Sequence, residues 1–283
     1  MLKRDLIIGL ALFILVAILV LWIIWGNTAL ILSEYTVSSS KLPEAFSGFR
    51  IVQVSDLHNT QIGNDNSKLL EMIQNAQPDI IVITGDLIDS WKTDLDVAVD
   101  FVGSAVQIAP CYYVTGNHEA RIAEYDTLKQ NLIELGVTVL DDTARTIQYQ
   151  GSEISIIGIN DPSFYAYYLI GDEEASVENS LNSIGIEKDQ FQLLLSHRPE
   201  FFSVYVNYGI DLVFSGHAHG GQFRLPILGG LYAPNQGFLP QYDSGINQDG
   251  NTSMVVSRGI GNSLFPFRFN NRPEIIAVQL EHN

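Results

Sequence analysis

Residues 49–58 read Phe-Arg-Ile-Val-Gln-Val-Ser-Asp-Leu-His, an apolar run that ends in a carboxylate and an imidazole. The β-branched run predicts a buried strand over Phe49–Val54, with Asp56 and His58 just beyond its end. Four more apolar runs end in polar motifs, which are Gly85-Asp86-Leu87-Ile88-Asp89, Gly116-Asn117-His118-Glu119, Ser196-His197 and Gly216-His217-Ala218-His219. Five of the six histidines lie in these motifs. Polar groups therefore collect at the ends of predicted strands.

Strand and helix patterns alternate through the first half of the chain. Buried strands are expected at Asp79–Thr84 and Tyr112–Thr115, and helices over residues 66–76, 94–106 and 122–135. Apolar strands that alternate with helices favour a largely parallel sheet covered by helices.

The second half has a different spacing. Strands expected at Val137–Leu140, Thr146–Tyr149 and Ile154–Ile159 are separated by few residues, which predicts antiparallel pairing. Further strands are expected at Phe191–Leu195, Leu212–Phe214, Ser253–Ser257 and Ile275–Leu280. The predicted fold class is α/β, with two mixed β-sheets facing each other and helices on their outer sides.

The N-terminal segment predicts a membrane anchor. An uncharged run from Leu6 to Trp25 is long enough, at about 1.5 Å per residue, to cross roughly 30 Å of hydrocarbon. Lys3 and Arg4 favour a cytoplasmic N-terminus (residues 1–5) and a domain outside the cytoplasm. A cleaved signal peptide is the alternative, although no small-x-small site follows Trp25. Residues 26–48 are then a linker with a first strand, and 49–283 the catalytic domain.

The overall charge excludes some partners. A net charge of −17 repels nucleic acid and anionic headgroups, so no nucleic-acid partner is expected. A phosphate substrate would need local positive charge, which bound metal can supply. The single Cys111 excludes an intrachain disulfide and is expected in the core. Nothing in the composition predicts an oligomeric state.

The polar motifs predict one metal site. In open α/β sheets the carboxyl ends of the strands form the edge where ligands bind. Imidazole, carboxylate and amide oxygen, without cysteine, suit manganese, iron or zinc in a catalytic centre. About seven ligands exceed what one ion takes, so two divalent ions are expected, and such a pair can clamp a phosphoryl group for in-line attack.

The ordered series Asp-x-His, Gly-Asp-x-x-Asp, Gly-Asn-His-Glu, a lone His and Gly-His-x-His resembles that of the calcineurin-like metallophosphoesterases, over roughly Phe49 to Leu280. Flanking details, such as Val-Ser-Asp-Leu-His and Gly-His-Ala-His-Gly-Gly-Gln, are similar to the membrane-anchored bacterial branch. The resemblance implies an αββα sandwich. It implies that a first ion is held by Asp56, His58, Asp86 and His219, and a second by Asp86, Asn117, His197 and His217. His118 would then act on the scissile phosphate as general acid or charge stabiliser.

Other residues near the motifs receive secondary roles. Asp89 and Glu119 are expected to orient ligands or cap loops. Asp89 is followed by Ser90-Trp91 and not by Arg-Gly, which argues against the protein serine/threonine phosphatases.

Arg198, which adjoins a ligand, is expected to contact phosphate. Surface salt bridges are expected for Arg258, Arg268 and Arg272. Residues 223–240 form either an apolar lip for acyl or prenyl chains or a Pro/Gly-rich loop packed on the core.

The leading hypothesis is a membrane-anchored dinuclear phosphoesterase. Its substrate would be a phosphomonoester, phosphodiester or pyrophosphate, in a small molecule or in a lipid-linked or cell-envelope compound. A nuclease of the same superfamily is disfavoured by the acidic surface and the anchor. A catalytically silent binding module on the same fold is disfavoured because every implied ligand is present.

Overall fold

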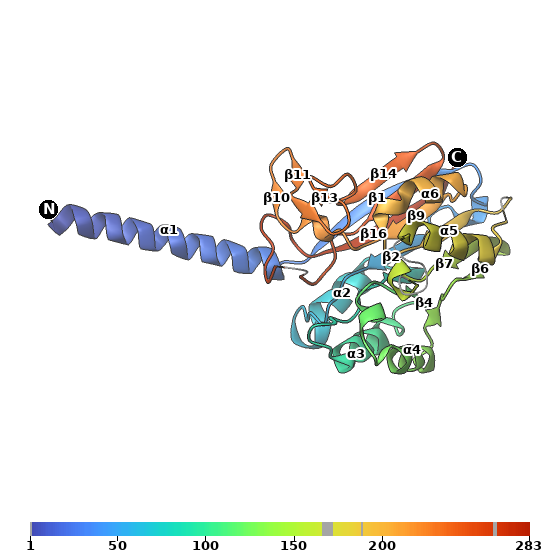
Figure 1. Ribbon diagram of the computed structural model, residues 1–283, viewed down its shortest axis with the longest axis horizontal. Coiled ribbons are helices and arrows are strands. Elements are labelled where there is room, and N and C mark those ends of the chain that lie inside the picture. The colour runs from blue at the N-terminus through green and yellow to red at the C-terminus, as the bar shows by residue number, and fades with distance from the viewer. Residues whose placement is uncertain (1, 166–171, 188, 263–264) are drawn as a thin grey trace.

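Two six-stranded sheets face each other at the centre of the computed structural model, which describes residues 2–165, 172–187, 189–262 and 265–283 (Figure 1). The strands of the first sheet are, in spatial order, β1 (Ile31–Ser39), β16 (Glu274–His282), β2 (Arg50–Val54), β3 (Ile80–Thr84), β4 (Cys111–Val114) and β5 (Thr138–Val139). Strands β2 to β5 run parallel, and β16 is antiparallel to β2.

The second sheet is also mixed. Its strands are, in spatial order, β14 (Gly245–Asp249), β15 (Thr252–Val256), β9 (Leu212–Ser215), β8 (Gln192–Leu195), β7 (Ser152–Gly158) and β6 (Thr143–Tyr149). The central strands β15, β9, β8 and β7 are parallel, and β14 and β6 close the two edges antiparallel to their neighbours. The two facing sheets confirm the predicted fold class.

Alternation along the buried strands places the core in three layers. In β3, Ile80 and Val82 join the cluster between the sheets, whereas Ile81 and Ile83 pack under the helices. The helices on that outer face are α2 (Ser67–Asn75), α3 (Leu95–Ala105) and α4 (Tyr125–Glu134). Helices α5 (Glu173–Ile184) and α6 (Phe202–Asn207) cover the other sheet (Figure 1). Residues buried on both faces of a sheet explain why these strands are apolar throughout.

One predicted pairing is wrong. The strands near residues 138, 146 and 154 were expected to pair antiparallel with one another, but β5 lies beside β4 in the first sheet and is parallel to it. Only β6 and β7 form the expected antiparallel pair. The chain crosses from the first sheet to the second between Val139 and Thr143. Leu140, which lies in this connection, is buried in the core between the sheets.

The remaining elements are short. Two small hairpins follow β9, formed by β10 (Arg224–Leu225) with β11 (Gly229–Gly230) and by β12 (Tyr232–Ala233) with β13 (Gly237–Phe238). Single 3₁₀ turns are η1 (Glu44–Phe46), η2 (Asn64–Asn66), η3 (Glu119–Arg121), η4 (Pro162–Phe164), η5 (Pro199–Phe201) and η6 (His219–Gly221).

The chain begins with a long apolar helix, α1 (Leu2–Thr28), that extends away from the sheets (Figure 1). Its residues Arg4–Thr28 are long and apolar enough to cross a membrane, and the apolar 18-residue window within them is not buried. The first strand expected within residues 26–48 is present as β1. It pairs with β16 over nine residues, so the helix leads directly into the first sheet.

Candidate metal centre

The five polar motifs meet at one edge of the two sheets. They occupy the loops after β2, β3, β4, β8 and β9, and backbone hydrogen bonds join these loops: Asp56 N–H donates to Gly85 O at 3.0 Å, and Gly216 N–H to His197 O at 3.1 Å. The seven residues expected as ligands are all buried, with no more than 6% of any of them exposed: Asp56, His58, Asp86, Asn117, His197, His217 and His219. The predicted convergence of the strand ends is thus what the structure shows.

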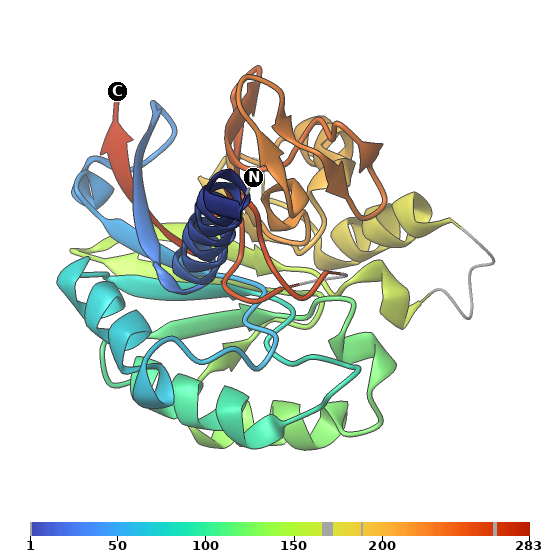
Figure 2. The same cartoon turned by 90° about the vertical axis from the view of Figure 1, so that its left-hand side faces the viewer.

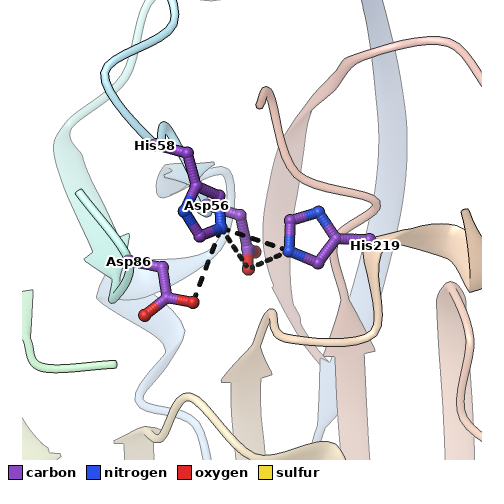
Figure 3. Close-up of side chains that lie close together, drawn as sticks. All are labelled: Asp56, His58, Asp86 and His219. Carbon is purple, nitrogen blue, oxygen red and sulfur yellow. Dashed lines mark hydrogen bonds and ion pairs between the residues drawn. The ribbon is translucent and has the colours of Figure 1, made fainter. Parts of the chain in front are cut away.

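The first group of side chains surrounds His58 (Figure 3). His219 Nε2 lies 3.2 Å from both His58 Nε2 and Asp56 Oδ1. His58 Nε2 lies 3.5 Å from Asp86 Oδ2. One potential ligand atom from each of these four residues lies within 4.8 Å of the others. Two imidazoles and two carboxylates at this spacing form a donor set for a divalent cation.

A second group shares Asp86 with the first. Asp86, His197 and His217 also bring one potential ligand atom each within 4.8 Å, and His197 Nε2 is 3.2 Å from Asp86 Oδ2. The Nδ1 atom of His197 lies 2.7 Å from the carbonyl oxygen of Thr84, to which it donates. This bond leaves the Nε2 lone pair of a neutral ring free for a cation. Asn117 lines the same cavity as Asp86 and His217.

The electrostatics of the two groups favour bound cations. Burial lowers the pKa of His58 to about 4 and the pKa values of His217 and His219 well below the usual range, so these rings are neutral and can ligate metal. Burial also acts to lower the pKa of His197, but Asp86 and Asp56 outweigh it and raise that pKa to about 10. The two carboxylates thus favour positive charge at this position, as a bound cation would supply.

The backbone at the site is held in an uncommon conformation. Asp56, His58, Asp86, His217 and His219 all have positive φ, between 47° and 63°. For non-glycine residues this left-handed conformation is unfavourable by roughly 1–2 kcal/mol each, and it persists where surrounding structure imposes it. Such clusters of strain are typical of functional sites.

The glycines of the motifs let the loops approach closely. A Cβ atom on Gly116 would overlap Oδ1 of Asp86, and one on Gly216 would overlap Oγ of Ser55. Both glycines therefore stand where the loop of one motif crosses the loop of another. This close approach explains why Gly precedes the ligand in Gly-Asn-His and in Gly-His-x-His.

Glu119 joins two motif loops. Its fully buried carboxylate accepts backbone N–H groups from Asp86 at 2.9 Å, Leu87 at 2.8 Å, Ile88 at 3.3 Å and Gly116 at 2.7 Å. It therefore acts as the expected loop cap. Asp89 accepts Trp91 N–H at 2.9 Å, and its Oδ1 lies 3.5 Å from His118 Nδ1.

His118 faces the cavity with a defined proton position. Its Nδ1 accepts the backbone N–H of Ser90 at 2.9 Å, so the neutral ring carries its proton on Nε2. Burial lowers the pKa of His118, which keeps the ring neutral. His118 also forms a third close group with His58 and Asp89. Its backbone N–H donates to Asp86 Oδ1 at 2.8 Å, which ties the histidine to the shared carboxylate.

A cavity of about 580 Å³ opens over these groups. Sequence reasoning missed several of its lining residues, which are Thr60, Trp91, Arg121, Asn262 and Pro266, whereas the lining residues Pro234 and Asn235 belong to the 223–240 segment considered above. Among the described residues of the lining, Arg121 is the one Lys or Arg, and its charge contributes to lowering the pKa of His118. The signal that could have revealed it is its position two residues after Glu119.

The expectation for Arg198 needs correction. Its buried guanidinium pairs with Asp161 through Nε at 2.6 Å and Nη2 at 3.0 Å, and Nη2 also donates to Ser163 at 3.0 Å. Arg198 does not line the cavity. Because Asp161 occupies the guanidinium in two-point contact, Arg198 fixes the η4 turn and is not a phosphate contact.

Arg268 also differs from expectation. It was expected in a surface salt bridge but is 1% exposed, and it donates to the carbonyl oxygens of Arg258 at 2.7 Å and of Gly261. Its Nη2 lies 3.4 Å from His219 Nδ1. Arg258 does form an ion pair, with its Nε 3.6 Å from Oε2 of Glu274. Arg272 instead donates from Nε to Ala29 O at 2.7 Å and stacks on the Trp25 ring. These arginines tie the segment after residue 264 to the site and to α1.

The comparisons with known proteins agree with this geometry. The family described as calcineurin-like phosphoesterase matches residues 49–221, more than half of the chain. The chain belongs to this family, whose members are metal-dependent phosphoric ester hydrolases. The resemblance predicted from the motifs and the predicted enzyme class are thereby confirmed, and the fold with its Asp/His groups supports divalent metal ions as cofactors.

Three relatives are similar over most of the chain. The metallophosphoesterase YkuE of Bacillus subtilis is 32% identical, covering 88% of this chain and 85% of its own. The phosphodiesterase YaeI of Escherichia coli is 26% identical, covering 82% of each. A protein of Danio rerio named as a transmembrane protein with a metallophosphoesterase domain is 30% identical, covering 88% of this chain and 56% of its own. Its name and the apolar helix α1 support a membrane-associated protein.

Proposed function

We propose that this chain is a membrane-anchored, dinuclear metal-dependent phosphoesterase in which Asp86 is shared by both ions. The observation that supports this most directly is that the Asp86 carboxylate belongs to two separate ligand groups. One group adds Asp56, His58 and His219, and the other adds His197 and His217. A buried carboxylate between two histidine groups is the arrangement that a bridging ligand requires.

The residues fit the two ions. Within the described part of the chain, Asn117 Oδ1 is buried and has no hydrogen-bond partner. A buried acceptor without a partner is rare, and a cation would satisfy it. The first ion would be held by Asp56, His58, Asp86 and His219, and the second by Asp86, Asn117, His197 and His217. When bound, the pair would supply positive charge for the phosphoryl group and activate a water molecule.

The chain's own residues supply the remaining chemistry. His118 carries a proton at Nε2 and lines the cavity, so its neutral ring can donate a hydrogen bond to the leaving-group oxygen and stabilise the charge that develops as the phosphorus–oxygen bond breaks. Arg121 provides positive charge at the cavity wall in an otherwise acidic protein, and it would bind a non-bridging phosphate oxygen. Ser90 fixes the His118 ring through its backbone N–H.

The bond that is cleaved is a phosphomonoester, a phosphodiester or a pyrophosphate. The name of the relative YaeI, a phosphodiesterase, supports testing a diester first. The apolar helix supports a lipid-linked or cell-envelope substrate, because the enzyme would work at a membrane surface. Manganese, iron and zinc all suit the donor set.

The experiment is a substrate panel with the full chain in detergent. Bis-aryl phosphate, aryl monophosphate and a lipid pyrophosphate are offered with added manganese, iron or zinc, and Asp86→Ala serves as the inactive control. Hydrolysis by the wild type and not by Asp86→Ala is expected. Failure to hydrolyse any substrate, with two metal ions bound, would show a silent binding module instead.

The orientation of the protein is part of the proposal. Lys3 and Arg4 precede the apolar run, and positive charge stays on the cytoplasmic side of a first span. The catalytic domain would then lie outside the cytoplasm. Protease added to intact spheroplasts should degrade the domain; a domain that is cleaved only after lysis contradicts this orientation.

A further inference from the structure

Exposed apolar side chains gather on the hairpins and the late segment beside α1. Ile227 at the β10–β11 turn is fully exposed, and large parts of Leu228, Phe238 and Leu239 are also in solvent. Phe265 and Phe267 of the late segment are exposed as well. We name these six residues the apolar rim. Clusters of this kind on a domain with 17 excess negative charges mark an interaction surface.

The rim is tied to the end of α1 through one segment of chain. Asn27 of α1 donates to Arg268 O at 3.0 Å and accepts Arg268 N–H at 2.7 Å, and Trp22 packs on Phe269 with 5.8 Å between ring centroids. Arg272 lies 4.7 Å from the Trp25 ring centroid. The last turns of the helix are thus fixed against residues 268–272, and the helix sets the position of the domain.

The hairpin with Ile227 is joined to the same segment. Phe223 forms a β-bridge with Phe269, and Arg224 N–H donates to Phe269 O at 3.0 Å. The Phe223 ring also packs on Phe265 at 5.1 Å and on Phe267 at 5.4 Å. Figures 1 and 2 both show the β10–β11 hairpin and the late segment beside the end of α1.

We propose that the apolar rim inserts into the interfacial region of the bilayer that α1 crosses, and so holds the catalytic domain against the membrane surface. Trp22 and Trp25 near the end of α1 mark the level of the interface, where indoles prefer to lie. Residues 268–272, which join the apolar rim to α1, contact the helix at these two tryptophans. Isoleucine, leucine and phenylalanine leave water when they enter this layer, which favours docking without positive charge.

Docking of the apolar rim places the entrance of the cavity at the lipid surface. Pro266 lines the cavity and stands between two rim residues, Phe265 and Phe267. The wall of the cavity and the rim are therefore parts of one segment. An amphiphilic phosphate held in the bilayer would have its headgroup beside the entrance. This consequence rests on the proposed function, whereas docking itself does not.

The test is a depth measurement on the full chain in phosphatidylcholine nanodiscs, with one chain per disc. An environment-sensitive fluorophore is attached to Ile227→Cys, and to Ile133→Cys on α4 as the control. Ile133 is an exposed apolar residue on a helix away from the hairpins (Figure 1). The native Cys111 is buried, and burial raises its pKa to about 12, so it does not take up the label.

Lipids with a doxyl group near the top of the acyl chain should quench the label at position 227 about twofold or more, and leave the label at 133 unchanged. The same quenching is expected when anionic lipid is added to the discs. Equal, weak quenching at both positions overturns the proposal. Quenching that requires anionic lipid overturns its apolar basis. A label at 227 that is shielded from aqueous iodide but not quenched by lipid shows a protein partner and also overturns it.

A second variant protects the test against effects of the label itself. With the fluorophore on Leu239→Cys, the double substitution Ile227→Asp and Leu228→Asp should reduce lipid quenching to about the level of the control. Both replaced residues are exposed, so the fold is retained, and circular dichroism checks this. Undiminished quenching at 239 in a folded double variant contradicts insertion of the rim.

Discussion

Glu119 accepts the backbone N–H of Asp86 through Oε2 at 2.9 Å, and this bond links the third motif to the residue shared by both ligand groups. The same oxygen accepts Gly116 N–H at 2.7 Å. One carboxylate therefore fixes the loops after β3 and β4 relative to each other. The positions of Asp86 and Asn117 depend on it, although Glu119 itself is in neither ligand group.

Replacing Glu119 by Gln should weaken both the fold and metal binding. The amide NH₂ cannot accept, so buried N–H groups lose their partner, and the free energy of unfolding should fall by about 2 kcal/mol. Metal affinity should fall about 10- to 100-fold because the ligand loops lose their support. Denaturant unfolding and metal titration measure these effects. The exposed Glu71→Gln is the matched control, and equal behaviour of the two variants would refute the role of Glu119.

Replacing His118 by Ala should separate turnover from metal binding. His118 lies outside the two ligand groups that share Asp86, so the metal content should stay at the wild-type value. Loss of the hydrogen-bond donor at Nε2 should lower kcat by roughly 10²- to 10³-fold. Metal analysis and steady-state kinetics on an aryl phosphate measure the two quantities. His282→Ala, remote from the motifs, is the control; a near-normal kcat for His118→Ala contradicts the role of His118 at the leaving group.

Replacing Arg121 by Gln should weaken substrate binding more than turnover. Arg121 is the cation of the cavity wall, and a charge-assisted bond to phosphate contributes about 1.5–3 kcal/mol, so KM should rise by about tenfold or more. Arg121→Lys should restore part of the loss. The exposed Arg145, outside the cavity lining, gives the control variant Arg145→Gln. An unchanged KM in Arg121→Gln would exclude phosphate contact.

The Asp161–Arg198 pair predicts a pH-dependent contribution to stability. Burial acts to raise the pKa of Asp161, but the Arg198 charge and its hydrogen bonds outweigh it and hold the pKa below the usual range. A depressed carboxyl pKa contributes stability above the unfolded pKa of about 4, and this is lost as the pH falls through the lower, folded value. Asp161→Asn should therefore lower the free energy of unfolding by about 3 kcal/mol at neutral pH and by less below pH about 4.

Thermal unfolding of the wild type and Asp161→Asn from neutral to acidic pH measures this difference. Exposed Asp100→Asn is the control and should differ little from the wild type at any pH. A difference for Asp161→Asn that stays constant as the solution is acidified contradicts an ionised Asp161.

The sequence predicted those parts of the molecule that follow from local pattern. A strand such as β3 is apolar at every position because both faces are buried, and the polar residue that follows it must lie at the sheet edge. That reasoning predicted that Asp56, Asp86 and His217 lie close together. The crossing after β5 was missed, because a short connection does not reveal which of two sheets takes the next strand.

Side-chain partners that are distant in sequence could not be predicted. Arg198 adjoins a ligand, but its partner Asp161 lies 37 positions earlier, so its burial was not evident. Arg268 was expected at the surface because nothing local shows that Gly261 and His219 surround it. Helix α5 was missed because serines share its buried face with Val177 and Leu181. Trp91 and Arg121 reach the cavity from loops without periodicity.

The number of metal ions bound per chain tests the central claim most directly. Full-length protein loaded with manganese or zinc and freed of excess metal is measured by mass spectrometry of the metal, beside Asp86→Ala. We predict two ions per wild-type chain and loss of both from Asp86→Ala, because this carboxylate belongs to both ligand groups. A single ion in the wild type, or two ions retained by Asp86→Ala, would contradict a dinuclear centre that shares Asp86.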